Sequence, residues 1–494
     1  METFDDIYLL DLHGNSKKRE RNPDGSEDKN VFDIQQGTCI GIFIKQKDTK
    51  KRLATVRHAH LWGVRELFKQ NEQGERELAG GKYHWLWQHD VSTTKWAKLK
   101  PQSPLYLFVP QDVNLREEYE QGWKVTEMMP INVLGFQSHR DDFAIDIDED
   151  RLRSRIAELR GTKDSDEELQ NRYALRDSGD WQLLRARKQL RSDKDWEKHF
   201  NRCLYRPFDN RVGYFSTVAM DRPRRELLEH VAGKENLCLN TVRQTKMELW
   251  QHAVVSDAPA PAVYVELKDG SNIFPLYLYP SEKRSLFDDE PTDALGGRRP
   301  NLAPEFIADI SAKLKLNFIA DGKGDLKKSF GPEDVFAYLY AVFHAPGYRS
   351  RYAEFLKIDF PRLPLTANVD LFRVLCRLGA ELVGLHLLER PAPLLTGYPI
   401  AGDNAVEAVR YDEAEQRVYI NKTQFFQGVP LEVWAFHVGG YQVCQKWLKD
   451  RKGRQLTYDD LTHYQRVVAA LARTIELMNE IDETINEHGG WPLK

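Results

Sequence analysis

An arginine–glutamine pair stands where an apolar, strand-like stretch of the chain ends. Residues 236–242 have the spacing of a strand, and Arg243, Gln244 and Lys246 follow. Arginine and glutamine side chains suit the edges of guanine and adenine, and lysine binds phosphate. The pattern therefore indicates nucleic-acid recognition, with a solvated protein surface as the alternative.

Three other stretches combine basic residues with aromatic or turn-forming ones. Tyr205–Arg211 is aromatic and basic, Met220–Arg225 opens a helix, and Gly439–Tyr441 precedes a helix with a strongly basic end. Such an end is suited to holding phosphate groups. The residues that we expect to contact DNA are Arg206, Arg211, Arg222, Arg224, Arg243, Gln244, Lys246, Tyr441, Lys446, Lys449, Arg451 and Lys452.

Two other patterns could support chemistry. Glu266-x-Lys268 closes an expected strand over 262–267, nine residues after Asp257, as in nucleases that hold a divalent cation and activate water. The alternative is a strand with an exposed charged end. His58-x-His60 places two imidazoles on one face of a strand, but no third ligand is evident, so we expect no metal site.

Motifs for nucleotide or hydrolytic chemistry are missing from the sequence. It contains no GxxxxGK[ST] loop, no GxGxxG after a strand, no GxSxG and no HExxH. Five cysteines, an odd number without a CxxC pair, exclude a disulfide framework and a cysteine-based zinc site.

Length and composition set the frame for these residues. The 494 residues predict two to four domains, and 41% hydrophobic residues exclude global disorder. The net charge of −4 neither requires nor excludes a nucleic-acid partner. No apolar run is long enough to span a membrane, and no signal peptide is recognisable, so we expect a cytoplasmic protein.

The elements that must position the candidate residues change in type along the chain. We expect strands over 7–12, 38–45 (buried) and 54–61, with a short helix over 64–69. A helical stretch follows over 148–201. Strands are expected over 236–242, 262–267 and 273–279, after a helix at 222–231. After residue 301 helices dominate, and Thr457 and Asp460 form a capping pair before the last one.

Several blocks of the sequence resemble type ISP restriction–modification enzymes. Ile7–Lys18, with its His13-Gly14-Asn15, and then Asn30–Gly37 and His60–Gly63 resemble the late part of the adenine methyltransferase domain. The target-recognition domain of these enzymes is resembled by a further set of blocks, in order: Tyr205–Asp209, Phe274–Pro280, Tyr348–Arg362 and Gly439–Val443. The resemblance spans nearly the whole chain.

The resemblance implies an α+β, multidomain chain. The residual edge of an α/β methyltransferase sheet would occupy 1–115, and a mixed α/β recognition domain 116–280. A linker over 281–300 and a helical second part over 301–494 would complete the chain. The family's enzymes combine nuclease, ATP-driven translocase, N6-adenine methyltransferase and recognition domains. This sequence departs from them, because it has neither their S-adenosylmethionine loop nor the catalytic Asn-Pro-Pro-Tyr motif.

The expected function is therefore sequence-specific recognition of double-stranded DNA, without catalytic or cofactor-binding residues of its own. S-adenosylmethionine, ATP and Mg would belong to the complete enzyme, and an upstream chain with the catalytic half is a possible partner. Two alternatives remain open. One is a Mg-dependent nuclease that uses Asp257, Glu266 and Lys268, and the other is a non-enzymatic interaction scaffold.

Overall fold

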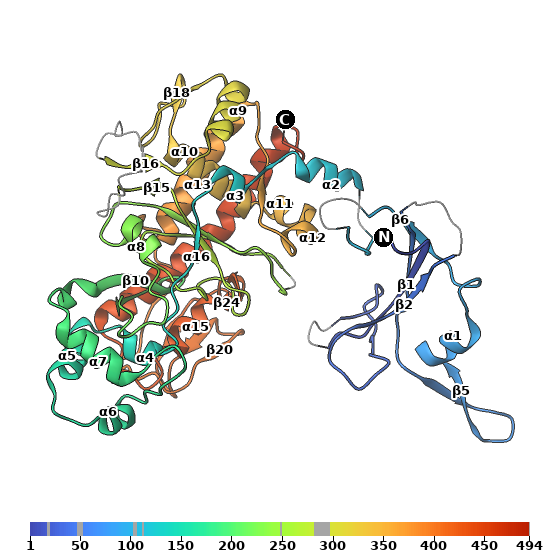
Figure 1. The fold of residues 1–494 in the computed structure, drawn as a ribbon, viewed down its shortest axis with the longest axis horizontal. Helices are drawn as coiled ribbons and strands as arrows, with labels where there is room; N and C mark the ends of the chain where they lie inside the picture. Colours follow the sequence, from blue (N-terminus) through green and yellow to red (C-terminus); the bar gives the residue numbers. More distant parts are fainter. Residues whose placement is uncertain are drawn as a thin grey trace. The chain divides into compact units, whose positions relative to one another are not determined.

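The computed structural model divides the chain into two compact units, Met1–Arg116 and Glu117–Lys494 (Figure 1). Each unit is described by itself. The structure describes residues 1–16, 20–46, 53–101, 106–110, 113–247, 249–280 and 297–493. Most of the predicted linker, residues 281–296, lies outside the described residues.

A four-stranded sheet forms the centre of the first unit. Its strands are β1 (Asp6–His13), β2 (Thr38–Ile44), β3 (Thr55–His60) and β6 (Ala97–Leu99), in the order β2-β1-β3-β6. β1 and β3 run parallel, and the other two pairs are antiparallel. The strands predicted over 7–12 and 54–61 are thus confirmed.

The strand predicted over 38–45 exists as β2, but the prediction that it is buried was wrong. Ile40, Ile42 and Phe43 keep 39%, 36% and 49% of their surface exposed. The cause is its position, because β2 is an edge strand that pairs with β1. An apolar composition alone does not distinguish an edge strand from a central one.

The helix predicted over 64–69 was also wrong. Those residues lead into a hairpin of β4 (Leu67–Gln70) and β5 (Arg76–Gly80), which is followed by α1 (Lys82–Gln88). The hairpin turns at Gly74, whose φ of +82° lies in the left-handed region that glycine tolerates. The pairing of β4 with β5 overrides the helical spacing of residues 64–69.

A buried ion pair fixes the turn that His13-Gly14-Asn15 forms after β1. Lys82 Nζ lies 2.7 Å from Asp28 Oδ1, and both side chains are fully buried. Lys82 also donates to the carbonyl of Leu12, and Asp28 accepts from the amide of Gly14. Gly14 has a φ of +82°, and a Cβ there would lie 2.3 Å from the Cα of Asn30. Only glycine fits this turn.

The second unit contains several small sheets. One has the order β10-β11-β9, and another has the order β13-β12-β14-β8. A third joins β20, β21 and β22, and the remaining strands form two-stranded pairs. The strands are β7 (Trp123–Lys124), β8 (Val133–Leu134), β9 (Ile145–Asp146), β10 (Phe200–Arg206), β11 (Asp209–Tyr214), β12 (Cys238–Thr241), β13 (Ala253–Ser256), β14 (Asn272–Pro275), β15 (Tyr277–Leu278), β16 (Arg299–Pro300), β17 (Asn317–Phe318), β18 (Ser329–Phe330), β19 (Arg362–Leu363), β20 (Arg410–Asp412), β21 (Arg417–Tyr419), β22 (Phe425–Gln427), β23 (His437–Val438) and β24 (Tyr441–Gln442).

Residues 262–267 do not form the predicted strand. The neighbours of β12 are β13 and β14, and 262–267 form turns and bends instead. The expectation of strands over 236–242 and 273–279 is met by β12, β14 and β15. The predicted mixed α/β architecture is thus confirmed, and its sheets are small.

Helices make up much of the second unit. They are α2 (Val113–Glu120, beginning before the unit boundary), α3 (Val125–Met128), α4 (Asp141–Ala144), α5 (Glu149–Gly161), α6 (Asp166–Arg172), α7 (Leu183–Ser192), α8 (Arg225–Val231), α9 (Pro304–Leu314), α10 (Pro332–His344), α11 (Pro346–Arg351), α12 (Ala353–Leu356), α13 (Val369–His386), α14 (Leu431–Trp434), α15 (Val443–Lys449) and α16 (Tyr458–Glu487), with a 3-10 turn at Trp196–His199. Within the described residues, no helix has the length and apolar character that crossing a membrane requires.

The long helices α10, α13 and α16 pack together in the core of this unit (Figure 1). α10 is buried along almost its whole length. Gly379 of α13 allows a close approach, because a Cβ at this position would lie 1.8 Å from the carbonyl oxygen of Ala337. α16 begins at the predicted cap, where Thr457 Oγ1 accepts from the amide of Asp460.

Candidate nucleic-acid interface

The 243–246 turn leaves the sheet at the end of β12, a strand that is paired on both sides. The side chains of Arg243 and Lys246 are 72% and 70% exposed. Arg243 Nε lies 3.9 Å from Asp359, and Lys246 Nζ lies 3.8 Å from Asp269. Such long, exposed ion pairs are weak. The two cations therefore follow a strand that is paired on both sides, and they remain available to another anion.

Gln244 lies between these two cations in the sequence and is exposed as well. Its Nε2 donates to Asp269 Oδ1 at 3.3 Å, a long bond. The amide therefore has hydrogen-bonding capacity beyond this one contact, since it carries a second donor hydrogen and an acceptor oxygen. The strand end thus presents two cations and one amide together.

Glu266 anchors the 243–246 turn from inside the protein. Its Oε2 accepts from Thr245 Oγ1 at 2.6 Å and lies 3.4 Å from His252 Nε2, and its Oε1 accepts from the amide of Leu267. Burial opposes ionisation, but the neighbouring His252 imidazole and the hydrogen bond from Thr245 outweigh it and lower the pKa of Glu266 to about 2. Glu266 is thus an ionised structural anchor, only 3% exposed.

The hairpin of β23 and β24 packs against the other side of the 263–269 loop. The amide of Gly440 donates to the carbonyl of Val265 at 2.9 Å, and the hydroxyl of Tyr441 donates to the carbonyl of Val263 at 2.6 Å. The guanidinium of Arg206 lies 5.2 Å from the centre of the Tyr441 ring. The 243–246 turn and the β23–β24 hairpin, which are far apart in the sequence, therefore contact the same 263–269 loop.

Arg211 and Arg451 lie mostly inside the protein. Both donate to Asp209 at 2.9 Å, and their side chains are 13% and 5% exposed. Burial lowers the pKa of Arg451 below its ordinary value, with Asp209 acting in the opposite direction. Arg451 thereby links the start of β11 to the segment after α15, whereas Arg211 pairs within β11 itself. The sequence did not indicate these internal roles.

The remaining predicted residues lie at two other positions. Lys446 pairs with Asp450, Lys449 donates to Gln445, and Lys452 is exposed beyond the end of α15. Arg222 and Arg224 precede α8, and Arg224 lies 3.6 Å from Glu226. Among the described residues, no hydrogen bond or ion pair joins these two arginines to the 243–246 turn.

The structure adds two surface residues that sequence reasoning did not assign to DNA binding. Leu267 is 50% exposed at the tip of the 263–269 loop, and Lys268 beside it is exposed. The sequence predicts that Leu267 ends a strand with apolar spacing, and it offers Lys268 only as part of a possible nuclease pattern. The signal that could have found them is the glycine pair at 439–440, which predicts a close backbone approach by some other segment.

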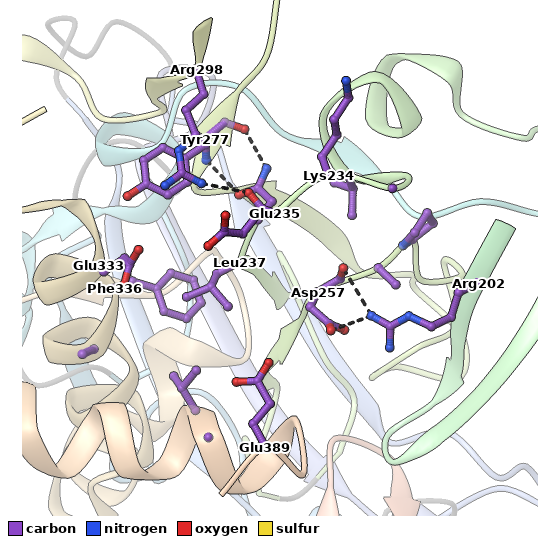
Figure 2. A pocket seen from close by; sticks show the side chains of 18 of the residues that line it. Arg202, Lys234, Glu235, Leu237, Asp257, Tyr277, Arg298, Glu333, Phe336 and Glu389 are labelled. Atoms are coloured by element: carbon purple, nitrogen blue, oxygen red, sulfur yellow. Dashed lines mark hydrogen bonds and ion pairs between the residues drawn. The ribbon is translucent and has the colours of Figure 1, made fainter. Parts of the chain in front are cut away.

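The carboxylates of the nuclease alternative occupy different surroundings. Asp257 lines a cavity of about 590 Å³ (Figure 2), where Arg202 Nη2 lies 2.5 Å from its Oδ2. Neither Glu266 nor Lys268 lines this cavity. Since Glu266 is buried, accepts a hydrogen bond from Thr245 and lies 3.4 Å from His252 Nε2, the arrangement does not favour a shared metal site for nuclease chemistry.

The cavity itself has a mixed lining. Besides Asp257 and Arg202, Figure 2 shows Glu235, Arg298 and Glu333 around it. Burial raises the pKa of Glu333, although Lys323 is 3.9 Å away. None of the twelve predicted DNA-contacting residues lines this cavity, so it is separate from the surface around the 243–246 turn.

The second unit thus combines small sheets and a helical core with an exposed basic turn at the end of β12. The chain belongs to the Type ISP C-terminal specificity domain family, whose sequence model matches residues 127–480. No curated protein matches the chain.

Solved structures match the fold over nearly the whole chain. The ATP-dependent Type ISP restriction-modification enzyme LlaBIII bound to DNA is 18% identical, with a TM-score of 0.63, over 97% of this chain and 31% of that one. A nuclease-deletion mutant of the Type ISP enzyme LlaGI with a DNA substrate mimic is 15% identical, with a TM-score of 0.60, over 97% and 37%. The DrdV–DNA complex is 18% identical, with a TM-score of 0.61, over 98% and 48%. The chain spans a third to a half of their lengths.

Proposed function

We propose that this chain recognises double-stranded DNA sequence-specifically, as the specificity part of a Type ISP-like restriction–modification system. The observation that carries the proposal is the turn after β12, which exposes Arg243, Gln244 and Lys246 at the end of a strand that is paired on both sides. Direct readout needs donors and acceptors held in fixed positions in a groove. The structures of LlaBIII, LlaGI and DrdV, which contain DNA or a DNA substrate mimic, support the same partner.

Within this proposal, the two cations and the amide have different tasks. Arg243 and Gln244 would read base edges, and Lys246 would contact phosphate. Lys268 and Leu267, on the adjoining loop, would extend the same face with a further cation and an apolar contact. Lys449 and Lys452 would add phosphate contacts, whereas Arg211 and Arg451 would act through the fold, because Asp209 already holds them.

The test is selection from a random duplex library by the full chain, followed by titration of the selected duplex at several salt concentrations. We expect an enriched sequence and an affinity that falls steeply between about 50 and 200 mM salt. Arg243→Ala should weaken binding, whereas Arg151→Ala removes an equally exposed arginine on α5 (68%) and should not. Affinity that does not depend on salt, or capture of proteins without any DNA binding, would favour the interaction scaffold instead.

We propose further that residues 1–115 are the end of an adenine methyltransferase sheet, and that 116–280 and 301–494 form the recognition domain. The exposed apolar residues of β2 support this, since an edge strand with Ile40, Ile42 and Phe43 at the surface is suited to further packing. The partner would be a chain carrying the catalytic half. S-adenosylmethionine, ATP and Mg would bind only in the complete enzyme, in the cytoplasm.

Calorimetry with S-adenosylmethionine tests this part separately. We expect no binding to the chain alone, because the sequence lacks the glycine-rich loop and the Asn-Pro-Pro-Tyr motif that position the cofactor and the flipped adenine. Supplying a catalytic half should produce N6-adenine methylation at sites that this chain selects. Micromolar cofactor binding by the chain alone would contradict the proposal and leave the DNA-binding experiment unaffected.

A further inference from the structure

Three potential metal ligands lie on one face of the sheet in the first unit. β1 and β3 are parallel, and their register places Asp11 directly beside His60. His58 lies two residues earlier on β3 and so faces the same side. The potential ligand atoms of Asp11, His58 and His60 all lie within 4.8 Å of one another. The third ligand comes from a neighbouring strand 47 positions away from His58, which is why His58-x-His60 alone did not reveal it.

His58 carries an unsatisfied buried nitrogen in this cluster. Its side chain is 3% exposed, and its Nδ1 has no hydrogen-bond partner among the described residues. A buried polar atom without a partner is costly.

A second layer of polar groups orients His60. His13 Nε2 lies 2.8 Å from His60 Nδ1, and His13 Nδ1 lies 3.0 Å from Glu20 Oε1. The arrangement is consistent if His60 Nδ1 donates to His13 and His13 donates to Glu20, because a carboxylate can only accept. The Nε2 of His60 is then unprotonated. Carboxylate–histidine chains of this kind fix the tautomer of metal ligands in proteins.

We propose that Asp11, His58 and His60 bind one divalent transition-metal ion, zinc above all. Two imidazoles and one carboxylate form a ligand set that zinc accepts, whereas magnesium and calcium prefer oxygen ligands alone. The site is new relative to DNA recognition, since it lies in the first unit and uses none of the residues assigned to DNA.

The ion would fasten β1 to β3 at the ends of the two strands. Since three protein ligands leave a tetrahedral ion one open position, that position would hold a water molecule. Because the ligands come from both strands, the folded unit would bind the ion better than the unfolded chain, so zinc would stabilise the first unit.

The experiment uses the full chain without an affinity tag, stripped of metal by a chelator. Zinc is titrated by calorimetry, and Co²⁺ is titrated by its visible absorption as a spectroscopic substitute. We expect one ion per chain and a tetrahedral Co²⁺ spectrum. Asp11→Asn and His60→Gln should each lower zinc affinity by about 100-fold or more, since loss of even an outer-shell partner lowers it about 10- to 100-fold. Circular dichroism of the metal-free variants checks that they fold.

The control is His84→Gln, which removes a histidine that bonds to Gln88 in the same unit. Its zinc affinity should equal that of the parent chain. Glu20→Gln should lower affinity about 10-fold or more if Glu20 orients His60 through His13. The proposal would be overturned by no zinc binding at micromolar concentrations, or by unchanged zinc affinity in folded Asp11→Asn and His60→Gln. It would also be overturned if only Cys39→Ser lost zinc affinity. Cys39 has an exposed thiol and lies on β2, where it pairs with Asp11 of β1.

Discussion

Arg451 donates from Nη2 to Oδ1 of Asp209 at 2.9 Å, across 242 residues of chain. Both side chains are at most 5% exposed, and Asp209 also accepts from Arg211. The guanidinium of Arg451 lies 3.4 Å from the centre of the Trp447 ring. This pair joins the start of β11 to the segment after α15, so the packing of these two segments depends on one carboxylate.

Asp209→Asn should destabilise the second unit by about 3–5 kcal/mol, because it leaves two largely buried arginines without their carboxylate. Urea unfolding followed by circular dichroism measures this. Asp195→Asn is the control, since its pair with Lys198 is exposed on both sides and should change stability by less than about 1 kcal/mol. A loss of less than about 1 kcal/mol in Asp209→Asn would show that solvent replaces the pair.

Gly439→Ala should disturb the contact between the β23–β24 hairpin and the 263–269 loop. Gly439 has a φ of +56°, and a Cβ there would lie 1.9 Å from the carbonyl oxygen of Val265. The backbone has to move, so we expect a loss of about 2 kcal/mol or more in unfolding free energy, together with weaker DNA binding. Gly161→Ala, where no atom lies within 4 Å of the added Cβ, should leave both unchanged or slightly raise stability. Equal changes in unfolding free energy and in DNA affinity for the two variants would contradict this packing argument.

The sequence predicted best those elements whose hydrogen bonds lie within one continuous segment, namely helices. α16 begins at the predicted Thr457–Asp460 cap, and α10 and α13 are among the helices predicted to dominate after residue 301. In α13 and α16 the capping hydrogen bond and the buried face are both encoded within one continuous segment. The resemblance to the Type ISP family likewise rested on continuous blocks, and the family match confirms it.

Pairing between distant segments could not be predicted. The sequence shows that residues 262–267 are apolar, but it does not show that β13 and β14 occupy both sides of β12. In the same way, Arg451 looks like an exposed cation in a basic run until Asp209 is brought beside it by the fold. Asp11 likewise reaches His60 only through the register of two parallel strands.

Acid should reveal the contribution of Glu266. Because its folded pKa, about 2, lies below the ordinary value of 4.5, the ionised group contributes stability that is fully present above about pH 4.5 and is lost as the pH falls toward 2. Glu266→Gln should therefore be less stable at neutral pH, by at most about 3 kcal/mol, and should approach the parent chain as the pH falls. Unfolding free energies measured from pH 7 downward test this. Glu229→Gln, an exposed site on α8, should parallel the parent at every pH.

Gln244 and Lys246 should differ in the kind of DNA binding that they support. Lys246→Ala should weaken binding to every duplex alike and reduce the slope of log affinity against log salt by about one, because one phosphate contact is lost.

Gln244→Ala should instead leave the salt slope and the affinity for unrelated duplexes unchanged. It should reduce discrimination at one base pair of the selected sequence by about 1–3 kcal/mol, since a lost amide contact affects only the base that it reads. Titrations of the selected duplex, of its single-base variants and of an unrelated duplex measure both effects, with Arg151→Ala as the control. A Gln244→Ala variant that weakens all duplexes equally would show that this side chain contacts the DNA backbone, and base readout would then have to come from another part of the 243–246 turn.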